Sequence, residues 1–405
     1  MVATIRFLVV LVVSLLIGSG SVAAQEKYGP GVTDTEIKIG QTQPYSGPAS
    51  SYGTVGKAEA AYFQMINDQG GVNGRKINLI SLDDGYSPPK TVEQVRRLIE
   101  QERVLLLFNN LGTPTNTAIH KYVNAQRVPH ILLATGATKW GDPEHYPWTI
   151  GFQPYYQAEA RIYARYVLQT KSSPKIAILY QNDDYGKDFV KGFKDGLGDK
   201  ASLIVKEVSY EVTDATIDSQ MVAVQSSGAD VFFNVSIPKF AAQAIRKASE
   251  LGWKPLHIIN QPAQSVASVL IPAGLDKSVG LVSAGWLKDP TDPQWKDDPA
   301  TKEWLAWMKR YYPEGSVQDV NNVGGYTAAQ ALVQVLRQCG DDLTRENVMR
   351  QVANLKDLEL PMLLPGIRVN TSPTDFYPVE QMQLMRFDGK QWVRFGEIID
   401  ASRSR

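Results

Sequence analysis

A repeated alternation of short apolar runs with helix-like segments constrains the fold more than any other feature of the chain. Between these runs, apolar residues recur at the spacing of a helix face. In the first part of the chain this pattern predicts strands at 36–40, 76–82, 104–108 and 130–133, and helices at 52–66, 90–102 and 118–126. Because such an alternation joins parallel strands through helices, we expect a parallel sheet covered on both faces.

The same alternation starts again near Phe152 and indicates a second, similar lobe. Strands are predicted at 175–180, 203–208, 231–234 and 257–260, and helices at 155–168, 217–225 and 239–251. In parallel sheets of this kind, ligands bind beyond the carboxyl ends of the strands. We therefore expect a site between the two lobes.

The order of elements changes beyond Gly280. A strand through Trp286 is followed by predicted helices at 300–312, 321–339 and 344–355. Two alternating runs at 379–387 and 391–398, joined by Asp388-Gly389-Lys390, then predict a β-hairpin. Late strands after helices predict that the chain crosses between the lobes several times, which makes a hinge.

The first residues have the pattern of a secretory signal peptide. Arg6 precedes the apolar run 7–17, and small residues at Val22 and Ala24 place cleavage before Gln25. An uncleaved anchor is the alternative, but the apolar run is short for a transmembrane helix. There is no cysteine at the cleavage site to carry a lipid. We expect residues 1–24 to be removed and the mature chain to be free in an exported compartment.

Composition limits the class of partner. About 380 residues remain after cleavage, enough for two cores. Lys plus Arg and Asp plus Glu both total 42, so net charge gives no attraction to nucleic acid or to an anionic membrane. A small molecule or a protein is the expected partner. The single cysteine, Cys339, cannot form an internal disulfide, and its apolar helical neighbours predict a packed thiol.

The stretch Asn109–Thr117 is a candidate anion site. It follows a predicted buried strand and opens a predicted helix, with Thr113 as the expected N-cap and Pro114 as the expected first helical residue. The free N–H groups of such a turn attract a carboxylate or phosphate. An ordinary capped helix explains the same residues.

Enzymatic chemistry has little support in the sequence. The pairs Asp83-Asp84 and Asp183-Asp184 are adjacent residues whose side chains point opposite ways in an extended segment, so we expect turn or capping roles. Four histidines are scattered without metal-ligand spacing, and no nucleophile elbow, P-loop or dinucleotide fingerprint is present. We expect neither an enzyme nor a bound metal or cofactor.

Five segments together resemble one protein family. They are Ile37-Lys38-Ile39-Gly40, Ser46-Gly47-Pro48-Ala49-Ser50-Ser51-Tyr52-Gly53, Ile66-Asn67-Asp68-Gln69-Gly70-Gly71-Val72-Asn73-Gly74, Asp83-Asp84 and Asn182-Asp183-Asp184-Tyr185-Gly186. In this order and spacing, and over nearly the whole mature length, the chain resembles the periplasmic solute-binding proteins of ABC importers. The most similar branch is the type I, leucine/isoleucine/valine-binding group.

The resemblance implies an α/β fold of two Rossmann-like lobes with parallel central sheets, joined by a three-strand hinge. On that basis the first lobe is expected to hold residues 25–153 and 286–375, and the second lobe residues 154–285 and 376–405. It further implies a periplasmic protein, acting as a monomer, that closes on a small solute and meets an ABC permease in the inner membrane. A ligand-sensing receptor component that passes its closed state to a signalling partner is the alternative.

The resemblance also suggests candidate site residues. The ligand carboxylate is expected at Thr113 and at the segment formed by Thr135, Gly136 and Ala137. Tyr52 matches an aromatic position that packs on the ligand, and Tyr185 matches an aromatic position of the closing lobe. Further candidates are Ile237, Gln261 and Tyr326.

Two positions depart from the family pattern. Where amino-acid binders of this branch carry a glutamate for the ligand ammonium, this chain has Asn260-Gln261-Pro262-Ala263, and Ile237 lies near a position that is often tyrosine. An ammonium without that carboxylate loses a charge-assisted partner that contributes about 1.5 to 3 kcal/mol. An aromatic or aliphatic acid without an amine therefore fits at least as well as a branched-chain amino acid.

Overall fold

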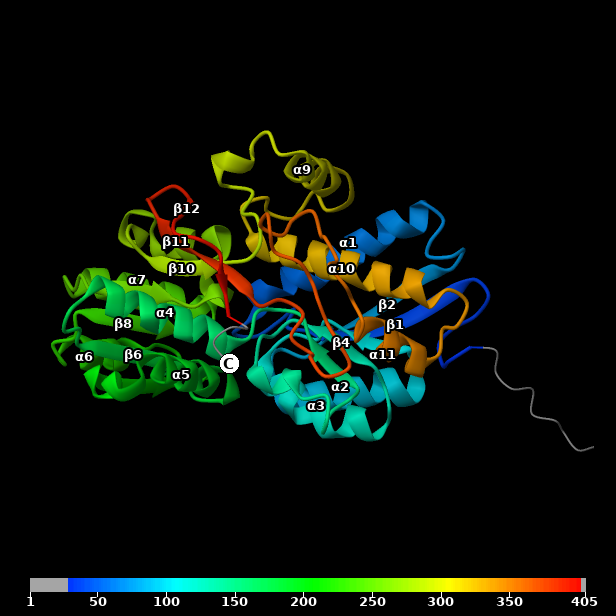
Figure 1. Cartoon of the computed structure of the whole chain (residues 1–405), viewed down its shortest axis with the longest axis horizontal. Coiled ribbons are helices and arrows are strands. Elements are labelled where there is room, and N and C mark those ends of the chain that lie inside the picture. Colours follow the sequence, from blue (N-terminus) through cyan, green and yellow to red (C-terminus); the bar gives the residue numbers. More distant parts are fainter. Residues whose placement is uncertain (1–27, 402–405) are drawn as a thin grey trace, which may run out of the picture.

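Two sheets, the first parallel and the second mostly parallel, lie side by side, each at the centre of its own lobe (Figure 1). The computed structural model describes residues 28–401, so the predicted signal peptide lies outside the described residues. The sheet of the first lobe has the strand order β2-β1-β3-β4-β5, and all of its neighbours pair in parallel. The carboxyl ends of these strands point toward the second lobe.

The first lobe alternates strands and helices as its sequence predicts. Its elements are β1 (Glu36–Gln43), α1 (Thr54–Asp68), β2 (Lys76–Asp83), α2 (Pro88–Arg96), β3 (Leu106–Phe108), α3 (Thr113–Ala125), β4 (His130–Leu133) and β5 (Thr149–Gly151). The alternating burial of Ile37 and Ile39, both fully buried, places one face of β1 in the core.

The second lobe is built on a sheet of order β12-β11-β10-β9-β8-β6-β7, with β13 pairing with β11. Its elements are α4 (Tyr156–Thr170), β6 (Ile176–Gln181), α5 (Asp184–Leu197), β7 (Ile204–Tyr210), α6 (Asp218–Gln225), β8 (Val231–Val235), α7 (Pro238–Glu250), β9 (Leu256–Ile259), α8 (Ile271–Ala273), β10 (Val282–Gly285), β11 (Gln381–Phe387), β12 (Trp392–Arg394) and β13 (Ile399–Asp400). Strands β6 to β10 run parallel, and β11 joins β10 in the antiparallel direction.

The chain crosses between the lobes three times, after β5, after β10 and before β11 (Figure 1). Between the last two crossings it forms α9 (Pro299–Tyr311), α10 (Val320–Cys339) and α11 (Arg345–Val352). Helix α10 packs along α1 of the first lobe, and α11 packs on α10. The predicted residue boundaries of the two lobes stay a prediction.

Short helical turns connect many of these elements. They are η1 (Ser50–Gly53), η2 (Arg97–Gln101), η3 (Thr138–Gly141), η4 (Gly198–Leu203), η5 (Gln261–Ala263), η6 (Val266–Leu270), η7 (Asp276–Ser278) and η8 (Pro293–Trp295), with η2 and η6 in π-helical geometry. Within residues 28–401, no helix is both long enough and apolar enough to cross a membrane.

Several local predictions are wrong in detail. Gly112, with φ of 101°, is the N-cap of α3; Thr113 is its first residue and Pro114 its second, because the Thr113 hydroxyl bonds outside the helix. The helix predicted at 90–102 begins at Pro88 and ends as the π-turn η2. The predicted last strand, 391–398, is shorter in the structure: it forms only β12, Trp392–Arg394, and β13 begins beyond it at Ile399, after Gly396 with φ of 68°.

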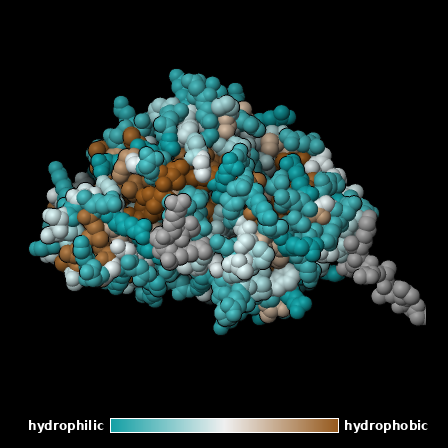
Figure 2. All heavy atoms as spheres, in the orientation of Figure 1, coloured by the Kyte–Doolittle hydropathy of each residue, from teal (hydrophilic) through white to brown (hydrophobic). Residues whose placement is uncertain are grey.

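The turn and core predictions are confirmed. Asp388 accepts hydrogen bonds from the N–H groups of Lys390 and Gln391 at 2.8 and 2.9 Å, which closes the β11–β12 hairpin. The Cys339 side chain is buried. Apolar residues fill the interior of both lobes, and Figure 2 shows that polar residues cover most of the face seen there.

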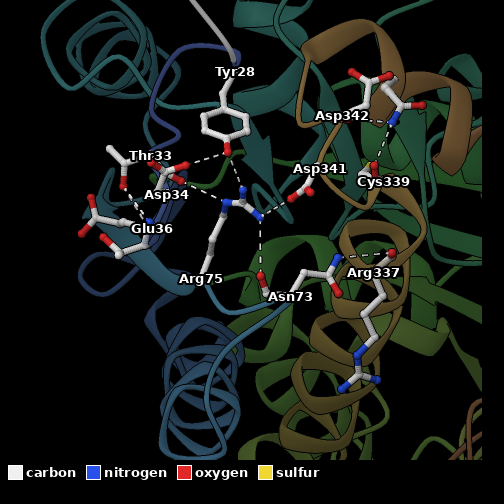
Figure 3. A network of polar contacts seen from close by, with 12 residues as sticks. Tyr28, Thr33, Asp34, Glu36, Asn73, Arg75, Arg337, Cys339, Asp341 and Asp342 are labelled. Atoms are coloured by element: carbon white, nitrogen blue, oxygen red, sulfur yellow. Dashed lines mark hydrogen bonds and ion pairs between the residues drawn. The ribbon is translucent and has the colours of Figure 1, made fainter.

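The start of the described chain is attached to the first lobe through Arg75 (Figure 3). Its guanidinium donates to the Thr33 carbonyl at 3.0 Å and to the Tyr28 hydroxyl at 2.8 Å, and it pairs with Asp341 at 3.0 Å. The Tyr28 ring lies 4.8 Å from the guanidinium carbon. One side chain thus joins the segment before β1, the start of β2 and the loop after α10.

Candidate functional site

A cavity lies between the two lobes at the carboxyl ends of their strands. It is lined by Tyr52, Val55, Tyr86, Asn109, Leu111, Gly112, Thr113, Ala134, Phe152, Gln153, Tyr156, Tyr185, Ile237, Gln261, Pro262, Trp286, Leu287, Val320, Asn321 and Gly324. The space open to the centre of a water-sized sphere is about 60 Å³. One water needs about 10 to 15 Å³ on this measure, so the cavity has room for a small solute.

The lining carries no charged side chain. It is mainly aromatic and apolar, and it also has four side-chain amides. Tyrosines come from both lobes, Tyr52 and Tyr86 from the first and Tyr156 and Tyr185 from the second. Burial raises the pKa of Tyr156 to about 12 and raises the pKa of the other three well above the ordinary value. All four hydroxyls are therefore neutral near pH 7 and can donate or accept hydrogen bonds.

The β3–α3 turn forms the first-lobe wall. Gly112 has φ of 101°, and a Cβ added there would lie 2.5 Å from Cε2 of Tyr86 and 2.7 Å from Oγ1 of Thr115. Glycine is thus required both by the backbone and by the packing of Tyr86. Asn116 of α3 donates to the carbonyls of Asn110 and Gly112 at 2.9 and 2.6 Å, which fixes the turn from behind.

The hydroxyl of Thr113 is directed by a buried network. Its Oγ1 lies 2.7 Å from Oγ1 of Thr135, which also accepts from the N–H of Ala137 and from Nε1 of Trp140, both at 3.3 Å. The Tyr156 hydroxyl also donates to this oxygen of Thr135, at 3.4 Å, and either hydroxyl of the Thr113–Thr135 pair can be the donor. The network holds Thr113 at the cavity wall, beside the first N–H groups of α3.

The second-lobe wall is held by capping and by hydrogen bonds to backbone. Asp183 caps α5 by accepting from the N–H groups of Tyr185 and Gly186 at 2.9 and 3.3 Å. The Tyr185 hydroxyl donates to the Ser236 carbonyl at 3.2 Å and accepts from the Asn260 side chain. Tyr185 is therefore fixed at both ends of its side chain.

One hydrogen bond crosses the cavity from lobe to lobe. The Tyr52 hydroxyl, in η1 of the first lobe, donates to the carbonyl of Pro262, in η5 of the second, at 2.9 Å. Both residues line the cavity. This bond belongs to a closed arrangement of the lobes, because separating them would break it.

The structure gathers five of the nine predicted site residues around the cavity: Tyr52, Thr113, Tyr185, Ile237 and Gln261. Thr135, Gly136 and Ala137 are buried and are not among the lining residues; of the three, Thr135 contacts Thr113. Tyr326 packs in the first-lobe core, with its ring centre 4.9 Å from that of Tyr62 and 4.7 Å from that of Trp307. Direct ligand contact by these residues stays a prediction.

Sequence reasoning missed several lining residues. Tyr86 follows the Asp83-Asp84 pair at the carboxyl end of β2, a position that the strand-end rule could have found. It has φ of 60°, which is strained for a bulky residue. Phe152 and Trp286 lie on the first and second crossovers with ring centres 5.6 Å apart, and only the three-dimensional arrangement of the crossovers brings them together.

The acidic pairs have the structural roles that the sequence predicts. Asp83 accepts from Ser46 and from Lys90, whose Nζ lies 2.8 Å away, and Asp84 accepts from the Tyr86 N–H at 2.9 Å and from Thr91 at 2.9 Å. Asp183 is the cap of α5. No group of three or more His, Cys, Asp or Glu side chains suited to a metal ion occurs within residues 28–401.

A buried carboxyl group lies directly behind the second-lobe wall. Oε1 of Glu159 accepts from the N–H of Gln261 at 2.6 Å and from the Tyr163 hydroxyl at 2.8 Å. Burial raises the pKa of Glu159 to about 8, so it is mostly protonated at pH 7. It holds the cavity-lining segment at Gln261 without presenting a negative charge, and it is not itself among the lining residues.

Comparisons with known proteins agree with this architecture. The model of the periplasmic binding protein family matches residues 36–391. A Leu/Ile/Val-binding protein homolog 7 of Brucella abortus is 28% identical over 341 residues, which cover 78% of this chain and 81% of the relative.

Two solved structures share the fold. A branched-chain amino acid ABC transporter protein from Thermus thermophilus with bound valine has a TM-score of 0.81 at 17% identity, covering 91% of this chain and 97% of that one. A fatty acid ABC transporter substrate-binding protein from Thermomonospora curvata has a TM-score of 0.78 at 23% identity, covering 93% and 96%. The family model matches most of the chain, residues 36–391, so the chain belongs to the periplasmic binding protein family.

Proposed function

We propose that this chain is the extracytoplasmic solute-binding component of an ABC importer and that it captures a small carboxylate-bearing solute by lobe closure. The observation that carries the proposal is the small, uncharged cavity between the lobes, which Thr113 lines at the start of α3. The names of the Thermus and Thermomonospora neighbours support both the importer role and an acidic ligand.

Capture begins at the first lobe. The solute carboxylate accepts from Thr113 and from the N–H groups at the start of α3, while Tyr52 and Tyr86 contact its apolar body. The second lobe then closes, bringing Tyr185, Ile237 and Gln261 onto the other side. Since the solute contacts both lobes only when they are closed, it shifts the population toward that state.

The chemistry of the wall favours a solute with an acid group and no amine. An ammonium group in this cavity would meet no ionised carboxylate, because the lining is uncharged and Glu159 is mostly protonated near pH 7. A branched-chain amino acid and an aliphatic or aromatic acid of the same size remain the two classes to compare.

Family membership also supports a cellular role. We place the mature chain in the periplasm as a monomer without enzymatic activity, delivering its solute to a permease of the inner membrane that recognises the closed lobes. The predicted cleavage before Gln25 supports this location.

The test compares leucine with 4-methylpentanoate, which has the same carbon skeleton without the amine, by isothermal titration calorimetry. We expect 4-methylpentanoate to bind more tightly, and Thr113→Val to weaken its binding about tenfold through loss of a charge-assisted donor. Thr170→Val, at the end of α4 and far from the cavity, serves as the control and should change nothing. Equal affinities of Thr113→Val and the unaltered protein would refute the carboxylate site.

A further inference from the structure

Polar contacts also join the lobes outside the cavity, at the N-terminus of α10, where Ser265 donates to Asp319 at 2.8 Å, and at α5. The group at α5 contains a carboxylate that binds both lobes. We call this group the α5 latch. It consists of Asp184 and Asp188 on α5 of the second lobe, and of Thr117, Thr138 and Lys139 of the first lobe. None of these residues lines the cavity. The α5 latch can therefore affect closure without touching the solute.

Asp188 makes the main contact of the latch. Its Oδ2 accepts from both the N–H and the hydroxyl of Thr138, at 2.8 and 2.9 Å. Its Oδ1 accepts from Nε2 of Gln157, on α4 of the same lobe, at 2.6 Å. One oxygen is thus fixed within the second lobe while the other binds the first, and hydrogen bonds to a carboxylate are stronger than those between neutral groups.

Asp184 adds a weaker, more exposed contact. Its Oδ2 lies 2.5 Å from Nζ of Lys139 and 3.2 Å from Oγ1 of Thr117. The side chains of Lys139 and Asp184 are 35% and 49% exposed, so solvent screens this ion pair and its contribution is small. Asp188 is therefore the residue on which the latch depends.

Thr138 also forms a hydrogen bond with Tyr377, a residue of the last crossover. The Tyr377 hydroxyl donates to the Thr138 carbonyl at 2.8 Å. The ring of Tyr377 also packs where a Cβ on Gly141 would stand, 2.0 Å from Cζ. Asp188 of α5 thus accepts from the N–H and the hydroxyl of Thr138, and Tyr377 of the last crossover donates to its carbonyl. These bonds fix η3 between α5 and the last crossover.

We propose that the Asp188–Thr138 contact is a closure latch, which stabilises the closed arrangement independently of the solute, so that the lobes sample closure before any solute arrives. A contact present only in the closed state shifts the open–closed equilibrium by its own free energy, whatever else is bound. This inference rests on the closing motion in the proposed function, and not on the identity of the solute.

The experiment measures closure without solute, on the full mature chain. Spin labels at two exposed positions, Ala125→Cys in the first lobe and Lys200→Cys in the second, report the distance between the lobes by double electron–electron resonance. Cys339 is buried and is left in place. We expect both a short and a long distance in the unaltered protein.

The latch variants should change the balance of these two distances. Asp188→Asn replaces an acceptor by an amide that cannot accept from Thr138 and Gln157 at once, and should lower the closed-to-open ratio about tenfold. Thr138→Val removes only the hydroxyl and should lower the ratio about threefold. This milder variant decides the result if Asp188→Asn fails to fold.

Asp195→Asn is the matched control, because Asp195 lies on the same helix and pairs with Lys191, four residues before it and in the same lobe. It should leave the distance distribution unchanged. The proposal is overturned if the unaltered protein shows no closed population, if neither latch variant lowers it, or if the control lowers it equally. Since no solute is added, these outcomes leave the solute-binding proposal standing, and calorimetry tests that separately.

Discussion

At the scale of single residues, the most informative side chain is the buried carboxyl of Glu159. It lies in α4, one helical turn after the cavity-lining Tyr156, and supports the backbone of Gln261. Burial raises its pKa to about 8, well above its ordinary value of 4.5. The folded protein therefore binds a proton here that the unfolded chain has released.

The sign of the resulting pH dependence follows from linkage. A raised folded-state pKa gives a stabilising contribution that is complete below about pH 4.5 and is lost as the pH rises to about 8. Glu159→Gln cannot ionise, yet it keeps an oxygen to accept from Gln261 and Tyr163. We expect the free energy of unfolding of Glu159→Gln to rise, relative to the unaltered protein, between pH 5 and pH 8.5.

Urea denaturation at several pH values measures this difference. Glu144→Gln, at an exposed position, is the control and should follow the unaltered protein at every pH. Parallel pH profiles for Glu159→Gln and the unaltered protein would contradict the assignment of this proton to Glu159.

At the scale of elements, the start of α5 connects stability to the site. Asp183 caps the helix, and the second helical residue, Tyr185, lines the cavity. Asp183→Ala should destabilise the protein by about 1 kcal/mol, the usual cost of a lost N-cap. It should also weaken binding of 4-methylpentanoate, because the first turn that places Tyr185 loosens. Thermal unfolding and calorimetry measure the two effects.

A second capped helix provides the comparison. Thr344 caps α11 by accepting from the N–H of Asn347, far from the cavity. Thr344→Ala should lower stability by a similar amount, about 1 kcal/mol, and leave solute affinity unchanged. If both variants weakened binding equally, the α5 cap would have no special connection to the site.

The elements themselves were largely predictable from the sequence, since most of them have a regular pattern of apolar residues and clear turn residues. The errors lie where local signals compete. Thr113 is a good N-cap by residue type. In the structure Gly112, with its positive φ, occupies the N-cap position instead, and the Thr113 hydroxyl forms a hydrogen bond with Thr135. The prolines at 88 and 89 were placed before α2, although proline is favoured in the first helical turn.

The candidate site was less predictable, because its walls come from segments far apart in the sequence. Tyr52 and Tyr185 were found through family resemblance and through their position at strand ends. Phe152 and Trp286 carry no local signal, since aromatic residues beside strands usually belong to the core. Only the meeting of two crossovers brings them to the cavity.

At the scale of the whole molecule, closure depends on bonds that exist only when the lobes meet. The Tyr52 hydroxyl donates across the cavity to Pro262. Tyr52→Phe keeps the ring but leaves that carbonyl without its partner, so the closed state loses about 1 kcal/mol and the dissociation constant for 4-methylpentanoate should rise about fivefold. Calorimetry measures the affinity.

Global unfolding of Tyr52→Phe should change little if the open form already lacks this bond. Tyr122→Phe, whose hydroxyl meets Glu100 within the first lobe, is the matched control and should leave affinity unchanged. An unaltered dissociation constant for Tyr52→Phe would show that the bond contributes nothing to closure.

The placement of Phe152 and Trp286 has a mechanical consequence. Both residues belong to crossovers, so a solute in this cavity would lie beside two of the segments that join the lobes. A solute held beside the crossovers would set the angle between the lobes. When a lobe rotates, the displacement of each of its atoms grows in proportion to the distance of that atom from the rotation axis. A solute larger by one methyl group therefore moves the distant rims farther than it moves the cavity wall. Under the proposed function, the outer faces would then report the size of the solute as an angle, which a permease could recognise without contacting the solute itself.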